Sequence, residues 1–169
     1  MIITDSFFAP SDFIISYKTP VLPVIIDRIF WYHLIPLNKV QARLTFKVRV
    51  SYSTKGQPSG YRPFWWEKQK GRSGNSEHTF GDRGSDENNE DQVVNSKGGC
   101  DITCDNFADN KDALLQALID ETDYTRFAVY NTFIHADYKD TYKNKRQLFR
   151  TEIDPDSGNV EWVYEKEIK

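Results

Sequence analysis

The chain contains only three histidines, and two of them, together with one aspartate, form a set that can bind a catalytic metal ion. His78 lies in a turn bounded by glycines, Asp101 follows a pair of glycines, and His135 lies in a largely apolar segment. Two imidazoles and one carboxylate are a common ligand set for catalytic zinc, and they leave a fourth coordination position open for water. The pattern therefore predicts a zinc (Zn2+) site at His78, Asp101 and His135, provided that the fold brings the three together.

Strand alternation can direct two of these residues into one cleft, because successive side chains of a β-strand point to opposite faces. If residues 100–104 form a strand, Asp101 lies on the face opposite its apolar neighbours. In residues 133–138 the same alternation places His135 and Asp137 on one face. The spacing is also compatible with an ordinary sheet that carries a surface histidine and a turn aspartate.

The remaining histidine and the two cysteines are explained by packing. His33 ends an apolar helical segment, where we expect it to pack or to cap the helix. Cys100 and Cys104 would have Cα atoms about 13 Å apart on one strand, beyond the limit of about 7 Å for a disulfide. We therefore expect two free thiols. A closed zinc site that used these thiols is disfavoured, because alternation places them on the face opposite Asp101.

Several elements must position these residues. The hydrophobic pattern predicts an α+β fold, in which two or three helices pack on a mostly antiparallel sheet. The expected helices cover residues 24–33, starting near Pro23, residues 37–46 after Pro36, a short helix at 64–70, and residues 111–122 after a cap at Asp109 or Asn110. The expected strands cover residues 47–53, 100–104, a pair within 126–138 broken at Asn131, and a C-terminal hairpin at about 146–166.

Composition restricts the class of protein. A chain of 169 residues with 38% hydrophobic and 14% aromatic residues fits a single globular domain, residues 1–169. A net charge of −3 without a basic stripe gives no basis for nucleic-acid binding. The most apolar segment, residues 21–37, contains Asp27 and Arg28, which cost about 2.5–3.5 kcal/mol each in a bilayer. We therefore expect a buried helix there and no membrane insertion.

The segment at about residues 82–92 is acidic and rich in amides, with no large apolar residue before Val93. Its residues do not match the ligand spacing of a calcium loop. Long polar segments inside a domain are usually functional or flexible. We expect a solvated loop insertion at this position.

Four short motifs resemble the zinc D-alanyl-D-alanine carboxypeptidase type of peptidoglycan peptidase, to which the zinc-holding hedgehog domain is similar in fold. In one-letter code the motifs are SGYRP at 59–63, NSEH at 75–78, GGCD at 98–101 and FIHAD at 133–137, and they occur in the family's order. The resemblance covers roughly residues 59–138, with a similar helix and strand before it.

The resemblance implies that His78, Asp101 and His135 are the zinc ligands. It also implies that Arg62 matches the family's arginine, which holds carbonyl or carboxylate groups of the substrate and stabilises charge during attack on the peptide bond. A planar guanidinium with parallel donors suits this task. Zinc would lower the pKa of its bound water toward about 7 and polarise the scissile carbonyl.

Two departures from the family pattern affect these expectations. The family separates its first histidine from the aspartate by far fewer residues than the 79–100 segment found in this chain. This leaves Asp82 as a rival ligand, although a closed insertion would preserve the geometry at a small entropic cost. The family also places an acidic residue where this chain has Thr132, so we expect Asp137 to act as the general base instead.

The expected function is therefore a zinc-dependent peptidase that hydrolyses peptidoglycan stem peptides or cross-links, either carboxypeptidase-like or endolysin-like. The alternative, favoured by Thr132, is a non-catalytic binding or structural module of the same fold that holds zinc. The first residues lack the features of a secretory signal. We expect synthesis in a cytoplasm and action at the bacterial cell wall, consistent with a phage lysis or virion protein.

Overall fold

The computed structural model describes residues 7–14, 20–53, 57–139 and 145–169. Its main sheet has six strands in the order β1-β4-β6-β5-β7-β8. Their bounds are Val48–Val50 (β1), Gly99–Cys104 (β4), Arg126–Val129 (β5), Ile134–Asp137 (β6), Arg146–Ile153 (β7) and Val160–Ile168 (β8). All neighbouring pairs are antiparallel except β5 and β7, which are parallel. The predicted α+β class with a mostly antiparallel sheet is confirmed.

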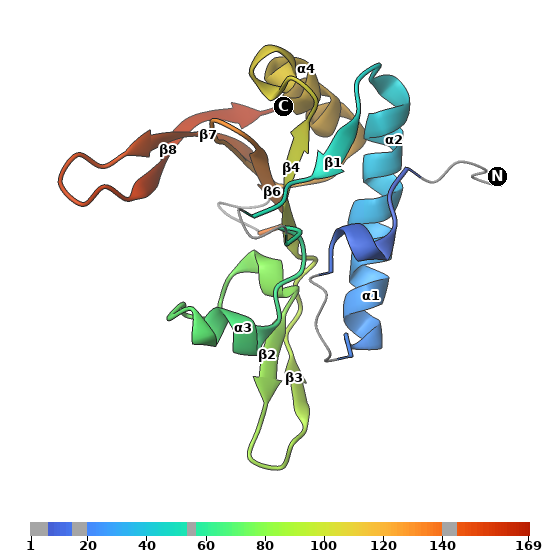
Figure 1. The fold of residues 1–169 in the computed structure, drawn as a ribbon, viewed down its shortest axis with the longest axis vertical. Helices are drawn as coiled ribbons and strands as arrows, with labels where there is room; N and C mark the ends of the chain where they lie inside the picture. The colour runs from blue at the N-terminus through green and yellow to red at the C-terminus, as the bar shows by residue number, and fades with distance from the viewer. Residues whose placement is uncertain (1–6, 15–19, 54–56, 140–144) are drawn as a thin grey trace.

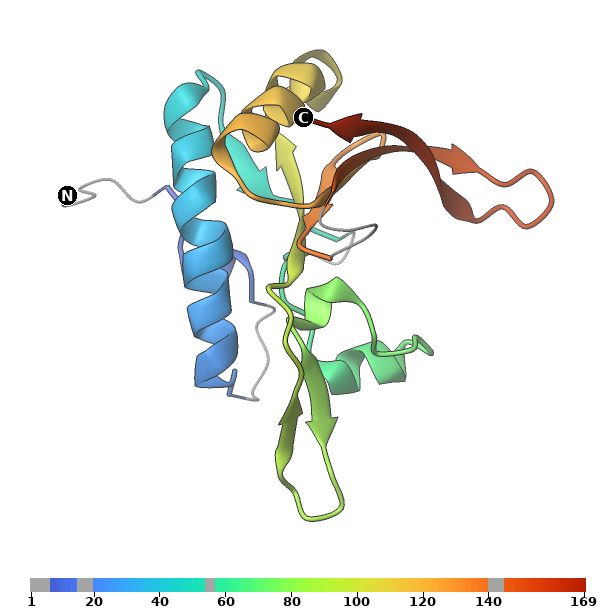
Figure 2. The same cartoon turned by 180° about the vertical axis from the view of Figure 1, so that it is seen from behind.

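The helices lie beside this sheet, as the two opposite views of the ribbon show (Figures 1 and 2). Their bounds are Pro10–Asp12 (η1), Pro23–Ile29 (α1), Phe30–Leu34 (η2), Ile35–Arg43 (α2), Phe64–Gln69 (α3), Glu77–Thr79 (η3) and Phe107–Glu121 (α4). The buried apolar side chains of α1, α2, α4 and the central strands form one core cluster. Among the described residues, no helix has the length and apolar character needed to cross a membrane.

The segments α1, η2 and α2 form one continuous helical rod, where the sequence predicted two helices. Pro36 has no N–H group to donate to the carbonyl of Tyr32, one turn earlier. The chain adopts a π-helical turn at η2, in which Ile35 N–H donates to Phe30 O. The freed Tyr32 carbonyl instead accepts a hydrogen bond from Tyr138 Oη at 2.7 Å. The proline therefore changes the hydrogen-bond pattern and ties the rod to the end of β6 without breaking the helix.

Helix α4 packs against α2 and β4 and buries Leu114, Ala117 and Leu118. It begins at Phe107, before the predicted cap at Asp109 or Asn110, because Asn106 adopts a left-handed conformation with φ 47° and asparagine tolerates that region. The short helix predicted at residues 64–70 is confirmed as α3.

The C-terminal hairpin predicted at about 146–166 is confirmed as β7 and β8, which pair through eight registered positions from Arg146 and Ile168 to Ile153 and Val160. Only the first part of β7 pairs with β5. The rest of the hairpin curves away from the body of the molecule (Figure 1).

The polar segment predicted as a loop at 82–92 is a second hairpin, formed by β2 (Asp82–Ser85) and β3 (Asp91–Val93). It projects from the end of the molecule opposite α4 (Figures 1 and 2). Its turn is held by the side chain of Asp86, whose Oδ1 accepts from the backbone N–H groups of Asn88 and Glu90. Sequence reasoning missed the strands because they carry almost no apolar residues.

Candidate metal centre

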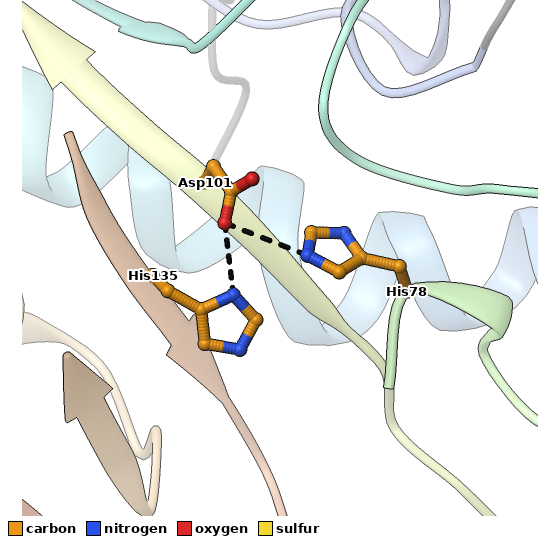
Figure 3. Close-up of side chains that lie close together, drawn as sticks. All are labelled: His78, Asp101 and His135. Atoms are coloured by element: carbon orange, nitrogen blue, oxygen red, sulfur yellow. Dashed lines mark hydrogen bonds and ion pairs between the residues drawn. The ribbon is translucent and has the colours of Figure 1, made fainter. Parts of the chain in front are cut away.

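His78, Asp101 and His135 lie together as predicted, and all three are buried, with exposures of 4%, 6% and 8%. One ligand atom from each lies within 4.8 Å of the other two. Figure 3 shows both imidazole rings directed toward the same carboxylate. These residues can hold a metal ion.

Strand pairing places two of these residues opposite each other. Asp101 on β4 and His135 on β6 are directly registered across the antiparallel pair. Side chains at such positions lie on the same face and in contact. His135 Nδ1 lies 2.8 Å from Asp101 Oδ1, and Cys100, Ile102 and Cys104 are buried on the other face as two free thiols and one aliphatic side chain. The predicted alternation is confirmed.

His78 reaches the cluster from the short helix η3. The Ser76 hydroxyl accepts a hydrogen bond from the backbone N–H of His78 at 3.3 Å, and the His78 carbonyl accepts one from Arg62 N–H at 2.8 Å. The ring is also fixed: Nδ1 lies 2.8 Å from the carbonyl oxygen of Gly60. Because a carbonyl only accepts, Nδ1 carries the proton, and Nε2 faces Asp101 Oδ1 at 3.5 Å.

The charges of the cluster fit a cation. Burial and the charge of Arg62 lower the pKa of His78, so its Nε2 presents a lone pair near neutral pH. Burial acts to raise the pKa of Asp101, but the two histidines hold it well below its usual range. For His135, burial lowers the pKa, yet the hydrogen bonds to Asp101 and Asp137 raise it to about 9. A proton at His135 Nδ1 therefore occupies the position from which a metal ion would bind this nitrogen.

The burial and the contacts of Asp137 are not those expected of a proton carrier. Its side chain is fully buried. One oxygen accepts from Arg126 Nε at 2.9 Å, and the other is bound by Arg126 Nη2 at 2.5 Å and by His135 Nε2 at 2.9 Å. These charge-assisted contacts hold the pKa of Asp137 far below its usual range, against the effect of burial. The contacts do not support the predicted role as general base; they fit a residue that orients a ligand.

Arg62 lies beside the cluster, in agreement with the motif that predicted it. Its Nη2 donates to Ser59 Oγ at 2.5 Å and lies 3.3 Å from Asp101 Oδ2. Its Nη1 lies 3.8 Å from the buried carboxylate of Glu67, and its guanidinium lies over the ring of Trp66. The arginine is thus held at the site by an acidic and an aromatic neighbour on α3.

A cavity of about 380 Å³ opens onto the three ligands. Its lining includes Arg62 and also residues that the sequence did not assign to the site, among them Glu77, Arg126, Tyr130, Phe133 and Trp162. Glu77 precedes the predicted ligand His78 in the sequence, and this position could have indicated that it lies at the site. No feature of the sequence indicated Trp162. Its ring centroid lies 5.2 Å from that of His135, but only because β7, the partner of its own strand β8, pairs with β5.

The rival ligand Asp82 is not at the site. Its Oδ2 accepts from Tyr61 Oη at 2.8 Å and from Phe64 N–H at 3.0 Å, and its Oδ1 accepts from Gly84 N–H at 2.8 Å. It therefore anchors the start of α3 and the base of the β2–β3 hairpin.

The positions of two further residues that the sequence singled out are also clear. Thr132 is exposed, and its carbonyl oxygen accepts from Thr103 Oγ1 at 2.7 Å. His33 is a packed core residue, and its ring nitrogens lie 2.8 Å from Tyr124 Oη and 2.8 Å from Lys97 O.

The chain matches no family model, no curated protein and no solved structure. The short motifs and the geometry of the site are therefore the basis for assigning a function.

Proposed function

We propose that this protein is a zinc-dependent peptidase that hydrolyses peptide bonds of peptidoglycan stem peptides or cross-links at the bacterial cell wall. The observation that carries this proposal is the convergence of His78 Nε2, Asp101 Oδ1 and His135 Nδ1 at a cavity of about 380 Å³. Two imidazoles and a carboxylate favour zinc over the hard cations, which prefer oxygen ligands alone. The four motifs shared with the zinc carboxypeptidase family support the choice of substrate.

Bound zinc would supply Lewis acidity for the scissile carbonyl and for the attacking water. The other tasks belong to side chains. Arg126 and Asp137 fix the ring of His135 so that Nδ1 faces the site. Arg62, which lines the same cavity, binds a carbonyl or carboxylate group of the substrate with its planar donors.

Glu77 is the best placed residue to carry the proton from the attacking water to the leaving nitrogen. Three carboxylates line the cavity, namely Glu77, Asp101 and Asp137. Asp101 is a ligand, and Asp137 is held by an arginine and a histidine. Glu77 is only half-buried, and one of its oxygens accepts a hydrogen bond from Ser96 Oγ at 2.9 Å. Its other oxygen has no partner among the residues that the structure describes.

A second proposal is a zinc-holding module of the same type that binds peptidoglycan without cleaving it. The exposed Thr132, at the position where the family has an acidic residue, favours this alternative. In that case zinc would stabilise the fold and complete a binding surface, and the cavity would hold the peptide without turnover.

The decisive experiment measures metal content and hydrolysis on the same preparation. Purified protein is analysed for zinc per chain and then incubated with peptidoglycan, with chelator, and with chelator followed by added zinc. Soluble fragments that require zinc support the peptidase. Stoichiometric zinc with no fragments, but with retention on peptidoglycan, supports the module. Absence of zinc binding contradicts both.

Two variants complete the test. His78→Ala should lose zinc and all hydrolysis, because it removes one of three ligands. Glu87→Gln is the matched control, since it changes an exposed residue in the β2–β3 turn that does not line the cavity. It should leave zinc content and hydrolysis as in the unaltered chain.

A further inference from the structure

Tyr130 contributes a fixed hydroxyl group to the cavity that contains the metal ligands. It follows β5 directly, in the turn to β6, where its backbone N–H donates to Phe133 O at 2.9 Å. Its ring stacks on Phe133, with centroids 4.3 Å apart and an interplanar angle of 18°. The turn and the stacked ring together limit the positions that the hydroxyl can adopt.

The hydroxyl is oriented by a donor from the C-terminal hairpin. Trp162 Nε1 donates to Tyr130 Oη at 2.8 Å. An indole N–H only donates, so Tyr130 uses a lone pair for this contact and keeps its own proton for another acceptor. None of the residues that the structure describes accepts that proton. Trp162 itself packs against Phe149 and against the guanidinium of Arg126.

The surroundings keep this hydroxyl protonated. Burial raises the pKa of Tyr130, and the charges of Asp101 and Arg62 also act on it, in opposite directions. The side chain is therefore a neutral donor throughout the physiological pH range. Of the two arginines of the cavity, Arg126 is engaged with Asp137. Arg62, assigned above to another group of the substrate, has its Nη2 engaged with Ser59 and Asp101.

We propose that the Tyr130 hydroxyl donates a hydrogen bond to the oxygen of the scissile carbonyl as negative charge develops on it. This inference rests on the proposed peptidase function and adds a catalytic residue to it. As water adds to the carbonyl carbon, a C–O bond forms and the π electron pair moves to the oxygen. The C=O bond then re-forms as the C–N bond breaks, and the leaving nitrogen keeps the pair of the broken bond and receives the proton that Glu77 took from the water. Tyr130 keeps its proton throughout and acts only as a preorganised donor.

The test compares Tyr130→Phe with Trp162→Phe in the zinc-loaded protein. The first variant removes only the hydroxyl, whereas the second keeps the hydroxyl and removes the indole that orients it. Zinc per chain is measured for each. Steady-state hydrolysis of a stem peptide gives kcat and KM, and calorimetry gives the Kd of a phosphinic dipeptide, whose anionic oxygens resemble the tetrahedral state.

We expect Tyr130→Phe to retain zinc, to lower kcat by about 10²- to 10³-fold, as removal of an oxyanion-stabilising donor does, and to leave KM nearly unchanged. The phosphinic dipeptide should bind at least about tenfold more weakly, in line with the stronger binding of transition-state analogues. Trp162→Phe should cause smaller losses in kcat and Kd.

The outcomes separate this proposal from the peptidase proposal. Hydrolysis and phosphinate binding equal to those of the unaltered chain in Tyr130→Phe would overturn the role of Tyr130 and leave the peptidase intact. Equal losses in both variants, or loss of zinc in Tyr130→Phe, would also overturn it, because Tyr130 would then act only as support for the cavity wall. An unaltered chain that holds zinc but neither hydrolyses the peptide nor binds the phosphinate would remove both proposals.

Discussion

Replacing Asp137 by asparagine should weaken metal binding. The Asp137 carboxylate is not one of the three proposed ligands, but it fixes the ring of His135, which is. Asp137 accepts from His135 Nε2 at 2.9 Å and from two nitrogens of Arg126. Asparagine has the same shape but one acceptor oxygen, so it cannot satisfy both neighbours and turns an N–H toward one of them. His135 then loses the partner that keeps its Nδ1 directed at the site.

The magnitude has two parts. Loss of a carboxylate that orients a ligating histidine typically lowers metal affinity by about 10- to 100-fold, or roughly 1.4–2.8 kcal/mol. The substitution also leaves the guanidinium of Arg126, whose side chain is only 15% exposed, without its anionic partner. Breaking such a buried pair costs about 3–5 kcal/mol of folding free energy.

The assay is a competition between the metal-free protein and a chromophoric chelator for zinc, with the free energy of unfolding measured in parallel by urea titration. Arg126→Gln is the matched control, because it breaks the same ion pair but leaves the Asp137–His135 hydrogen bond. It should lose stability with a smaller loss of zinc affinity. Unchanged zinc affinity in Asp137→Asn, with loss of turnover alone, would refute the orienting role and restore Asp137 as the general base.

Three further outcomes are expected. Glu77→Gln should retain zinc and lower kcat by about 10²- to 10⁴-fold in initial-rate assays; full activity would exclude it as the proton carrier. Burial lowers the pKa of His33 to about 4 from 6.5, so between these pH values the unfolded chain binds a proton that the folded chain does not. The free energy of unfolding should therefore fall by roughly 3 kcal/mol as the pH drops from 6.5 to 4. Urea titrations of metal-free His33→Gln should lack this loss. Gly98→Ala should destabilise the chain by at least about 1 kcal/mol in the same titrations, because Gly98 has φ +87° and its new Cβ would meet the Phe80 ring at 2.4 Å.

Much of the sheet could be predicted because apolar and polar residues alternate along its strands. Residues 100–104 alternate between a buried apolar face and a face that carries Asp101, and the hairpin of β7 and β8 has alternating arms with a turn-forming sequence between them. The limits of the helices were harder to predict. Pro36 indicated a break, but the long-range bond from Tyr138 to the Tyr32 carbonyl and the π-turn at η2 allow the rod to continue. Such a bond depends on tertiary packing.

The three candidate ligands could be predicted because their residue types and motif context are local properties. Their supporting residues could not, because those depend on strand pairing. Arg126 is registered opposite Asp137 across β5 and β6, and Trp162 reaches the cavity only because β7 adds to β5 in parallel. From sequence alone Asp137 looked like an unpaired acid on the correct face, and the role of general base followed from that incomplete view.

The length of the segment between His78 and Asp101 does not decide the geometry of the centre, because the inserted hairpin closes at its base. Val94 N–H donates to Gly81 O at 2.8 Å, and Arg28 Nη1 donates to the carbonyls of Phe80 and Val94. Gly81 allows this close approach, since a Cβ there would lie 2.1 Å from the Val94 carbonyl oxygen. The two ends of the hairpin are thus held to each other and to α1. These contacts at the hairpin base offset the entropic cost of the inserted residues, so the insertion does not disturb His78 or Asp101. Shortening the β2–β3 hairpin between Gly81 and Val94 should therefore leave zinc affinity unchanged. Arg28→Ala removes the contacts that hold the hairpin base, so it should weaken zinc affinity in the same chelator competition.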